Sequence, residues 1–147
     1  APGLRLLGLG PNLIPAKGIK KLKKLFDDNT FWAQGRNERN IKRLLANSSS
    51  IISIWEQSRM IGFGRATSDS IYRGVIWDVV VANDKQGLGI GKLIIKELLK
   101  SKNLRDVKKI YLMTTNKSQF YNQQGFQEVD NQRLFCLYQN QKNIIID

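Results

Sequence analysis

The stretch from Val75 to Lys100 reads VIWDVVVANDKQGLGIGKLIIKELLK and decides the fold that we predict for the chain. Its first part, Val75 to Ala82, is apolar and β-branched apart from Asp78, which is the composition of a buried strand. A glycine-rich turn, QGLGIG, follows at residues 86–91. Beyond it, an apolar row and a lysine row recur at helical spacing: Ile90, Ile94 and Leu98, and Lys92, Lys96 and Lys100. The stretch therefore predicts a strand, a glycine turn and an amphipathic helix packed on a sheet.

The glycine-rich turn has the composition of an anion site. The first amides of a helix have no partner inside the helix, and glycines let the backbone curl around a phosphate. A P-loop is excluded because Gln86 stands where its first glycine would precede Gly91. A dinucleotide fingerprint is excluded because Lys92 replaces its last glycine. The remaining pattern, Gln-x-x-Gly-x-Gly at Gln86, Gly89 and Gly91, is either a phosphate-binding turn or a strand-helix connection without a ligand.

Two absences in the composition exclude whole classes of chemistry. The chain has no histidine, so it has no Ser-His or Cys-His nucleophile and no His-ligated zinc site. Its single cysteine, Cys136, cannot form an intrachain disulfide, which indicates a reducing compartment, and we expect it to be a buried strand residue. The 147 residues suit one domain, 1–147, and no apolar run approaches the roughly 20 residues of a membrane span.

The net charge of +12 raises the possibility of a nucleic-acid partner. The cations crowd two early segments: Lys17, Lys20, Lys21, Lys23 and Lys24, then Arg36, Arg39, Lys42 and Arg43. The apolar residues between them keep helical spacing, so we expect solvated faces of amphipathic helices. Such a surface also attracts the phosphates of a ligand or an acidic protein.

The order of predicted elements gives an α/β chain with a mixed sheet. Helices are predicted at about 15–27, 37–46, 90–102 and 118–124. Strands are predicted at about 4–10, 51–57, 59–67, 75–82, 109–114, 126–129 and 133–138.

Three spaced motifs resemble the GNAT N-acetyltransferases, which bind acetyl-CoA. The first is the glycine turn, the second is the run from Phe120 to Phe126, FYNQQGF, and the third is Asn116 after the predicted strand at 109–114. More narrowly, residues 65–69 and 76–79, RATSD and IWDV, resemble the plastid and cyanobacterial branch that includes plant plastid serotonin N-acetyltransferases. The resemblance covers about residues 44–138. It implies a GNAT fold, with a mixed central sheet of about six to seven strands and flanking helices.

The resemblance also implies a reaction and a set of binding residues. The expected reaction is transfer of an acetyl group from acetyl-CoA, without a metal, to a primary amine by direct attack in a ternary complex. The expected acceptor is an arylalkylamine such as serotonin, or a protein lysine or N-terminal amine. A monomer or homodimer in the plastid stroma or the cyanobacterial cytoplasm is implied, with neither membrane nor nucleic acid as partner. The expected cosubstrate-binding residues are Val79, Val80, Val81, Gln86, Gly87, Leu88, Gly89, Ile90, Gly91, Lys92, Asn116 and Tyr121.

Tyr121 is the candidate acid toward the leaving sulfur. A phenol with a pKa near 10 giving its proton to a thiolate with a pKa near 8.5 is uphill by about 2 kcal/mol. A hydrogen bond that stabilises the thiolate is therefore as plausible as full transfer, and a purely structural aromatic role is the third interpretation.

Asp78 is the candidate base. A carboxylate inside an apolar strand is costly unless it is paired or functional. Asp78 is thus a base for the amine, an anchor for the substrate ammonium, or the partner of an arginine such as Arg65. Asp69 is a further acidic candidate at the acceptor side.

The aromatic residues have two possible roles, and the chain has two alternative functions. Phe31, Trp32 and Tyr72 line an acceptor pocket or fold onto the core, and Trp55 and Trp77 are expected in the core. The alternative functions are a GNAT-like domain that senses acyl-CoA without turnover, and a basic nucleic-acid-binding module.

Overall fold

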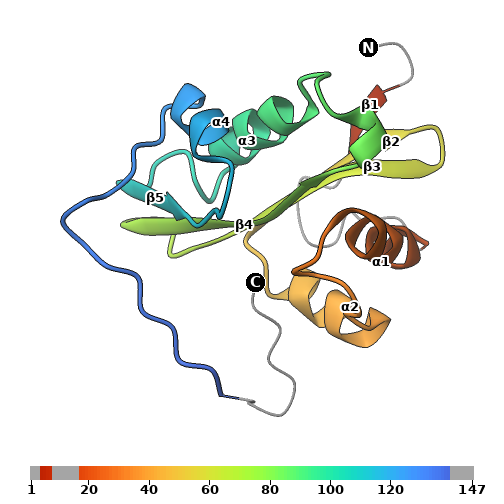
Figure 1. Cartoon of the computed structure of the whole chain (residues 1–147), viewed down its shortest axis with the longest axis horizontal. Coiled ribbons are helices and arrows are strands. Elements are labelled where there is room, and N and C mark those ends of the chain that lie inside the picture. The colour runs from red at the N-terminus through yellow and green to blue at the C-terminus, as the bar shows by residue number, and fades with distance from the viewer. Residues whose placement is uncertain (1–3, 8–16, 140–147) are drawn as a thin grey trace. The chain divides into compact units, whose positions relative to one another are not determined.

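The structure is a computed structural model that describes residues 4–7 and 17–139. The chain divides into two compact units, residues 1–113 and 114–147, and each is described by itself. The first unit holds the sheet and most of the helices (Figure 1). Its elements are β1 (Leu4–Leu7), α1 (Gly18–Asn29), α2 (Glu38–Ala46), β2 (Ser50–Glu56), β3 (Arg59–Ser68), β4 (Arg73–Val81), the 3-10 turn η1 (Asn83–Lys85), α3 (Ile90–Lys100) and β5 (Lys109–Leu112). The second unit holds α4 (Ser118–Gln123).

The sheet of the first unit is mixed. Its five described strands lie in the order β1-β2-β3-β4-β5. The first four strands are antiparallel neighbours, and β5 runs parallel to β4. The connection from β4 to the parallel β5 needs a long crossover, which α3 supplies.

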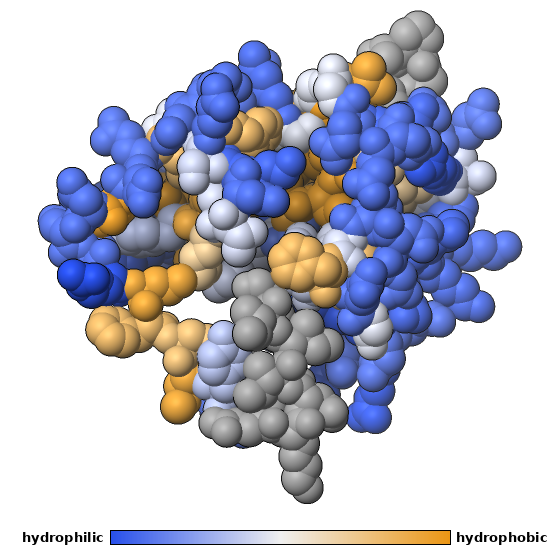
Figure 2. Space-filling view, viewed as in Figure 1, coloured by the Kyte–Doolittle hydropathy of each residue, from blue (hydrophilic) through white to orange (hydrophobic). Residues whose placement is uncertain are grey.

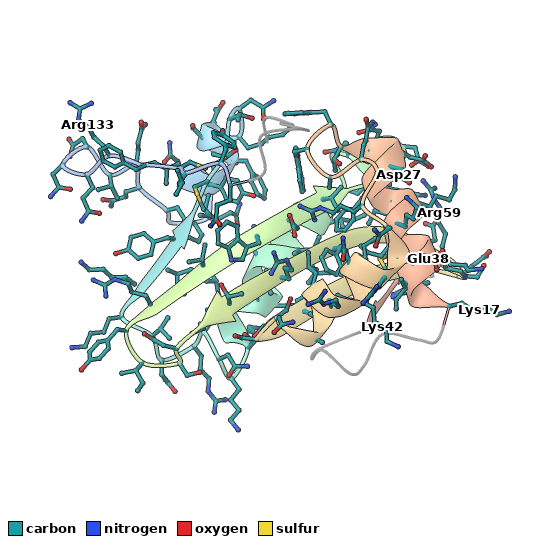
Figure 3. All side chains as sticks on the ribbon, turned by 90° about the horizontal axis from the view of Figure 1, so that it is seen from below. Lys17, Asp27, Glu38, Lys42, Arg59 and Arg133 are labelled. Atoms are coloured by element: carbon teal, nitrogen blue, oxygen red, sulfur yellow. The ribbon has the colours of Figure 1, made fainter. Side chains whose placement is uncertain are left out.

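Helices cover both faces of this sheet, and β3 shows why. Alternate residues of a strand point to opposite faces. A Cβ at Gly62 or Gly64 would meet side chains of α3, at 2.9 Å from Ile90 Cγ2 and 2.5 Å from Ile94 Cγ2, so α3 lies close on that face. Phe63 points to the other face and meets Phe26 of α1 edge to face, with ring centroids 5.6 Å apart. Figures 1 and 3 show α1 and α2 on the side of the sheet opposite to α3.

The predicted helices and inner strands are confirmed, with boundaries that move by a few residues. Asn37 precedes α2 and accepts a hydrogen bond from the Asn40 amide at 2.8 Å, which fixes where the helix begins. The α3 helix buries the predicted apolar row together with Ile95. The predicted start of the first helix at Pro15 lies outside the described residues.

The prediction of six to seven strands is wrong, because the last two predicted strands are absent. Within the described residues, 126–129 and 133–138 form no strand, and the sheet has five. Cys136 is accordingly exposed rather than buried in a strand. An apolar run becomes a strand only where a neighbouring strand takes up its backbone hydrogen bonds, and the described part of the chain offers these runs no such neighbour.

Candidate active site

The edge of β4 that faces β5 is only half paired. The parallel pairing runs from Arg73 opposite Lys109 to Ile76 opposite Leu112 and then stops. From residue 77 to 81, no described strand pairs with this side of β4. Backbone amides and carbonyls of a strand need partners, so this edge is open to an extended ligand. The segment includes Val79, Val80 and Val81, which the family resemblance places at the cosubstrate.

A bulge deforms β4 at the start of this open edge. On β3, Phe63 pairs with Val80 and Arg65 pairs with Trp77, so Asp78 and Val79 together face a single residue, Gly64. Asp78 has a φ of 54°, a left-handed conformation that is rare for a residue with a side chain. A bulge turns the strand locally, which is consistent with the loss of pairing to β5 beyond Ile76.

The Asp78 carboxylate is held between two arginines. Arg65 Nε donates to Oδ2 at 2.7 Å, and Arg36 Nη2 donates to Oδ1 at 3.3 Å. Arg36 Nη1 lies 3.1 Å from Oδ2 as an ion pair, and the Asp78 side chain is only 8% exposed. Of the three interpretations kept open for Asp78, these contacts favour the arginine partner.

Arg36 also belongs to this site, although no sequence pattern predicted it there. It lies 42 residues before Asp78, in the segment that leads into α2. Its guanidinium stacks near two aromatic rings, 5.2 Å from the centroid of Phe26 and 5.8 Å from that of Trp32. No local pattern around Arg36 distinguishes it from the other cations of the basic segments, so only the folded chain identifies it.

The glycine turn leaves the first turn of α3 without caps. Gly87 and Gly89 both have φ of +79°, and Gly89 is the residue before the helix. The first helical hydrogen bond runs from the Leu93 amide to Gly89 O at 3.0 Å, and no side chain caps the helix. The amides of residues 90–92 therefore meet no acceptor in the described part of the chain. Such amides, at the positive end of a helix dipole, form a site for an anion.

Gln86 braces the turn from within. Its Nε2 donates to the carbonyl oxygen of Val81 at 3.0 Å, which ties the start of the turn to the last residue of β4. Gln86 is expected to bind the cosubstrate; the contact that the structure shows for it is support of the turn. Leu88 and Lys92 are exposed at the same turn.

Tyr121 lies in the second unit, in a small aromatic cluster. Its ring meets Phe120 and Phe126 edge to face, with centroids 5.0 and 6.0 Å apart. The Phe126 amide donates to Tyr121 O at 3.1 Å after Gly125, which has a φ of +96°. Burial raises the pKa of Tyr121 above its ordinary value of 10.0, so the phenol keeps its proton at neutral pH. Asn116 is exposed in the segment before α4.

Other predicted candidates have structural partners. Asp69 Oδ1 accepts from the amides of Ile71, Tyr72 and Arg73 at 2.7–3.1 Å, so it holds the turn before β4. These hydrogen bonds lower the pKa of Asp69, the one from Ile71 most. Phe31 and Tyr72 are exposed, Trp32 is half-buried, and Trp55 lies in the core. Trp77 is also half-buried and donates to Thr67 Oγ1 at 2.9 Å.

The described residues contain no helix with the length and apolar character of a membrane span. They also contain no group of three or more candidate metal ligands.

Comparison with known families connects this geometry to a fold family. The sequence model of the acetyltransferase (GNAT) domain matches residues 47–128, more than half of the chain. The chain belongs to the GNAT family. The match spans the open β4 edge, the glycine turn and the Tyr121 motif, so the resemblance stated from those motifs is confirmed at the level of the family.

The curated GNAT relatives include proteins of the expected branch. A Pyropia yezoensis protein, "Uncharacterized N-acetyltransferase ycf52", is 38% identical over 67% of this chain and 59% of its own length. A Glycine max protein, "Histone acetyltransferase TAP1", is 41% identical over 49% of this chain and 32% of its own. The Oryza sativa "Serotonin N-acetyltransferase 2, chloroplastic" is 32% identical over 44% of this chain and 34% of its own length. The chain thus spans less than two thirds of these GNAT relatives.

A solved GNAT structure confirms the fold. A crystal structure assigned to this family, from Xanthomonas campestris pv. campestris, superposes with a TM-score of 0.77 over 93% of this chain and 94% of that chain. The two sequences are 21% identical, so this likeness concerns the fold alone.

Proposed function

We propose that this GNAT chain is an acetyl-CoA-dependent N-acetyltransferase that acts on a primary amine. The observation that carries the proposal is the open β4 edge at residues 77–81, followed in the same unit by the uncapped first turn of α3. The edge offers a row of backbone donors and acceptors, and the helix offers amides aimed at an anion. Acetyl-CoA has a matching pair of parts, an amide-containing pantetheine arm and a pyrophosphate.

The binding roles follow from this match. The amides of Val79 to Val81 bind the pantetheine arm and the thioester carbonyl, and the second contact strengthens as negative charge develops on the oxygen. The amides of residues 87–92, with the charge of Lys92, bind the pyrophosphate. Gln86 holds the turn, and Asn116 binds the pantetheine arm in line with the family motif.

Tyr121 donates a hydrogen bond to the departing thiolate. Because burial raises its pKa, complete proton transfer is less favourable than the value of about 2 kcal/mol expected for an ordinary phenol. The hydrogen-bonding role is therefore the better supported of the two chemical roles. Asp78 positions the β4 bulge through Arg36 and Arg65.

The acceptor is an arylalkylamine of the serotonin type or a protein amine, two classes that the names of the rice and soybean relatives represent. The amine attacks the thioester directly in a ternary complex, because the chain has no histidine to activate Cys136. We propose a monomer or homodimer in the plastid stroma or the cyanobacterial cytoplasm. The name of the rice relative, which is chloroplastic, supports the plastid location.

Calorimetry with acetyl-CoA, together with thiol release against a panel of amines, tests the proposal. Lys92→Gln should raise the Kd for acetyl-CoA by about five- to tenfold, because one charge near a phosphate is lost. Lys100→Gln is the matched control on the same helix row, about 12 Å further along the axis and beyond one Debye length, and should change the Kd less than twofold.

Two other outcomes would contradict either the proposed turnover or the proposed binding of acetyl-CoA. Tight acetyl-CoA binding without thiol release for any amine would indicate a sensor. Absence of acetyl-CoA binding, with salt-dependent retention on RNA or DNA, would indicate a nucleic-acid-binding module.

A further inference from the structure

The α2 helix carries cations that have no acidic partner among the described residues. Lys23 and Lys24 of α1 pair with Asp27 and Asp28 one turn later, so these two lysines are neutralised locally, whereas Lys20 and Lys21 form no ion pair with a described carboxylate. On α2, the exposed cations Arg39, Lys42 and Arg43 form no ion pair with a carboxylate of the described residues. Figure 2 shows a mainly hydrophilic surface over α1 and α2, and Figure 3 places Lys42 and Glu38 on α2.

A shallow groove, widely open to solvent, lies between this helix and the sheet. Its volume is about 480 Å³, and its lining residues come from α2 and β3: Asn40, Arg43, Leu44, Asn47, Arg65 and Thr67. None of these described lining residues is acidic or aromatic. Thr67 and Asn47 are engaged, since Thr67 Oγ1 accepts from Trp77 and Asn47 Nδ2 donates to Arg43 O at 2.8 Å. The Arg43 guanidinium is thus the main donor of the groove without a partner in the described structure.

The groove adjoins the open edge of β4 through Arg65. This arginine lines the groove and donates to Asp78 Oδ2 at 2.7 Å. Asp78 immediately precedes Val79, where the open edge continues toward the glycine turn. A chain bound in the groove therefore lies within a few residues of the proposed acetyl site.

We propose that this groove binds an acidic side chain of a peptide or protein acceptor, so that the amine acetylated belongs to an acidic segment. Arginine pairs with carboxylates through two parallel hydrogen bonds, which suits the free Arg43 fork. A protonated arylalkylamine is repelled by these cations and finds no aromatic lining. A single-stranded nucleic acid would also need a stacking platform, which the described lining residues do not provide. This inference rests on the proposed acetyltransferase function and specifies its acceptor.

Paired peptide acceptors test the inference. Two peptides share the same amine and differ only in carrying Asp and Glu, or Asn and Gln, near it. The native chain should acetylate the acidic peptide with a kcat/KM about tenfold higher, mainly through KM. Arg43→Gln should reduce this ratio to less than about twofold. The matched control is Lys42→Gln, which removes a neighbouring α2 cation that does not line the groove and should keep the ratio.

Three outcomes would overturn the inference. One is an equal kcat/KM for the two peptides. Another is an equal loss of preference in both variants, which would indicate a diffuse field rather than the groove. The third is that RNA, but not the acidic peptide, occupies this surface in a competition assay. Thermal unfolding of both variants checks that they remain folded. Acetylation of serotonin or neutral peptides without an acidic preference would refute this inference alone, whereas no acetylation of any amine would refute the proposed function itself.

Discussion

Replacement of Asp78 tests whether its carboxylate positions the bulge or takes a proton. The residue adopts a φ of 54° within β4, and its 8% exposed side chain bonds Arg36 and Arg65. A left-handed conformation costs roughly 1–2 kcal/mol for a residue with a Cβ. Two charge-assisted contacts, each worth about 1.5–3 kcal/mol, offset this cost. The geometry of the bulge therefore depends on the carboxylate.

The size of the effect follows from the burial of the partners. Removal of one member of a buried ion pair costs about 3–5 kcal/mol. The side chains of Arg36 and Arg65 are 27% and 16% exposed, so water partly solvates their charges when the carboxylate is removed. We expect Asp78→Ala to lower the free energy of unfolding by about 3 kcal/mol. Asp78→Asn keeps one acceptor oxygen and tolerates positive φ, so we expect about half of that loss.

Urea unfolding followed by tryptophan fluorescence measures the stability, and the pH profile of kcat/KM separates the two roles. A positioning role predicts that Asp78→Asn raises the KM for acetyl-CoA and leaves the acidic limb of the profile in place. A base would lose that limb in the same variant. Asp84→Asn is the control, because Asp84 pairs with Arg59 at the exposed surface and should matter little. A stable Asp78→Ala protein, or loss of the acidic limb in Asp78→Asn, would refute the reasoning.

Three further predictions concern the fold, the acid and the pH dependence. Gly64→Ala places a Cβ 2.5 Å from Ile94 Cγ2, so thermal or urea unfolding should show a loss of about 1–3 kcal/mol, and an unchanged stability would contradict the close packing of α3. Tyr121→Phe should lower kcat for thiol release by about 10- to 100-fold and change the KM for acetyl-CoA less than about twofold; an unchanged kcat would leave the ring a structural role. Hydrogen bonds from the Gly35 amide and from Lys23 lower the pKa of Asp27 below its ordinary 3.8. The stability that these hydrogen bonds supply is therefore present at neutral pH, and it is lost as the pH falls through the lowered pKa. Asp27→Asn should therefore cost about 0.5–1 kcal/mol in urea unfolding at neutral pH and nothing in strong acid, whereas a difference that persists in strong acid would contradict this linkage.

The glycine turn was predictable because its information is local. Positive φ at Gly87 and Gly89, and the helix that begins after them, follow from a few adjacent residues. The apolar rows of α3 likewise predict their own burial. The same local reasoning failed at residues 126–138, where an apolar pattern is present and the pairing strand is not. Strand formation depends on a distant partner, so a run of residues alone does not determine it.

The β4 bulge and the pairing of Asp78 with two arginines could not be predicted in full from the sequence motif. The sequence places Asp78 in an apolar strand and signals an unusual carboxylate, but the register shift that turns the strand arises from its pairing with β3. Arg65 was expected as an example of an arginine partner, and it lies on the neighbouring strand β3. Arg36 was not expected, because the fold alone brings the segment before α2 to β4.

The distribution of counter-charges explains why a single rule cannot describe both basic segments. The sequence predicts solvated faces of amphipathic helices for both segments. On α1, Lys23 and Lys24 meet carboxylates of their own helix, while Lys20 and Lys21 form no ion pair within the described residues. On α2 the apolar spacing is equally regular, yet Arg43 stands over a groove without a neutralising partner in the described chain. An unneutralised cation beside a groove raises the local concentration of anions more than the same cation in an ion pair. The position of the missing counter-charge, rather than the net charge of +12, is therefore what indicates an acidic acceptor.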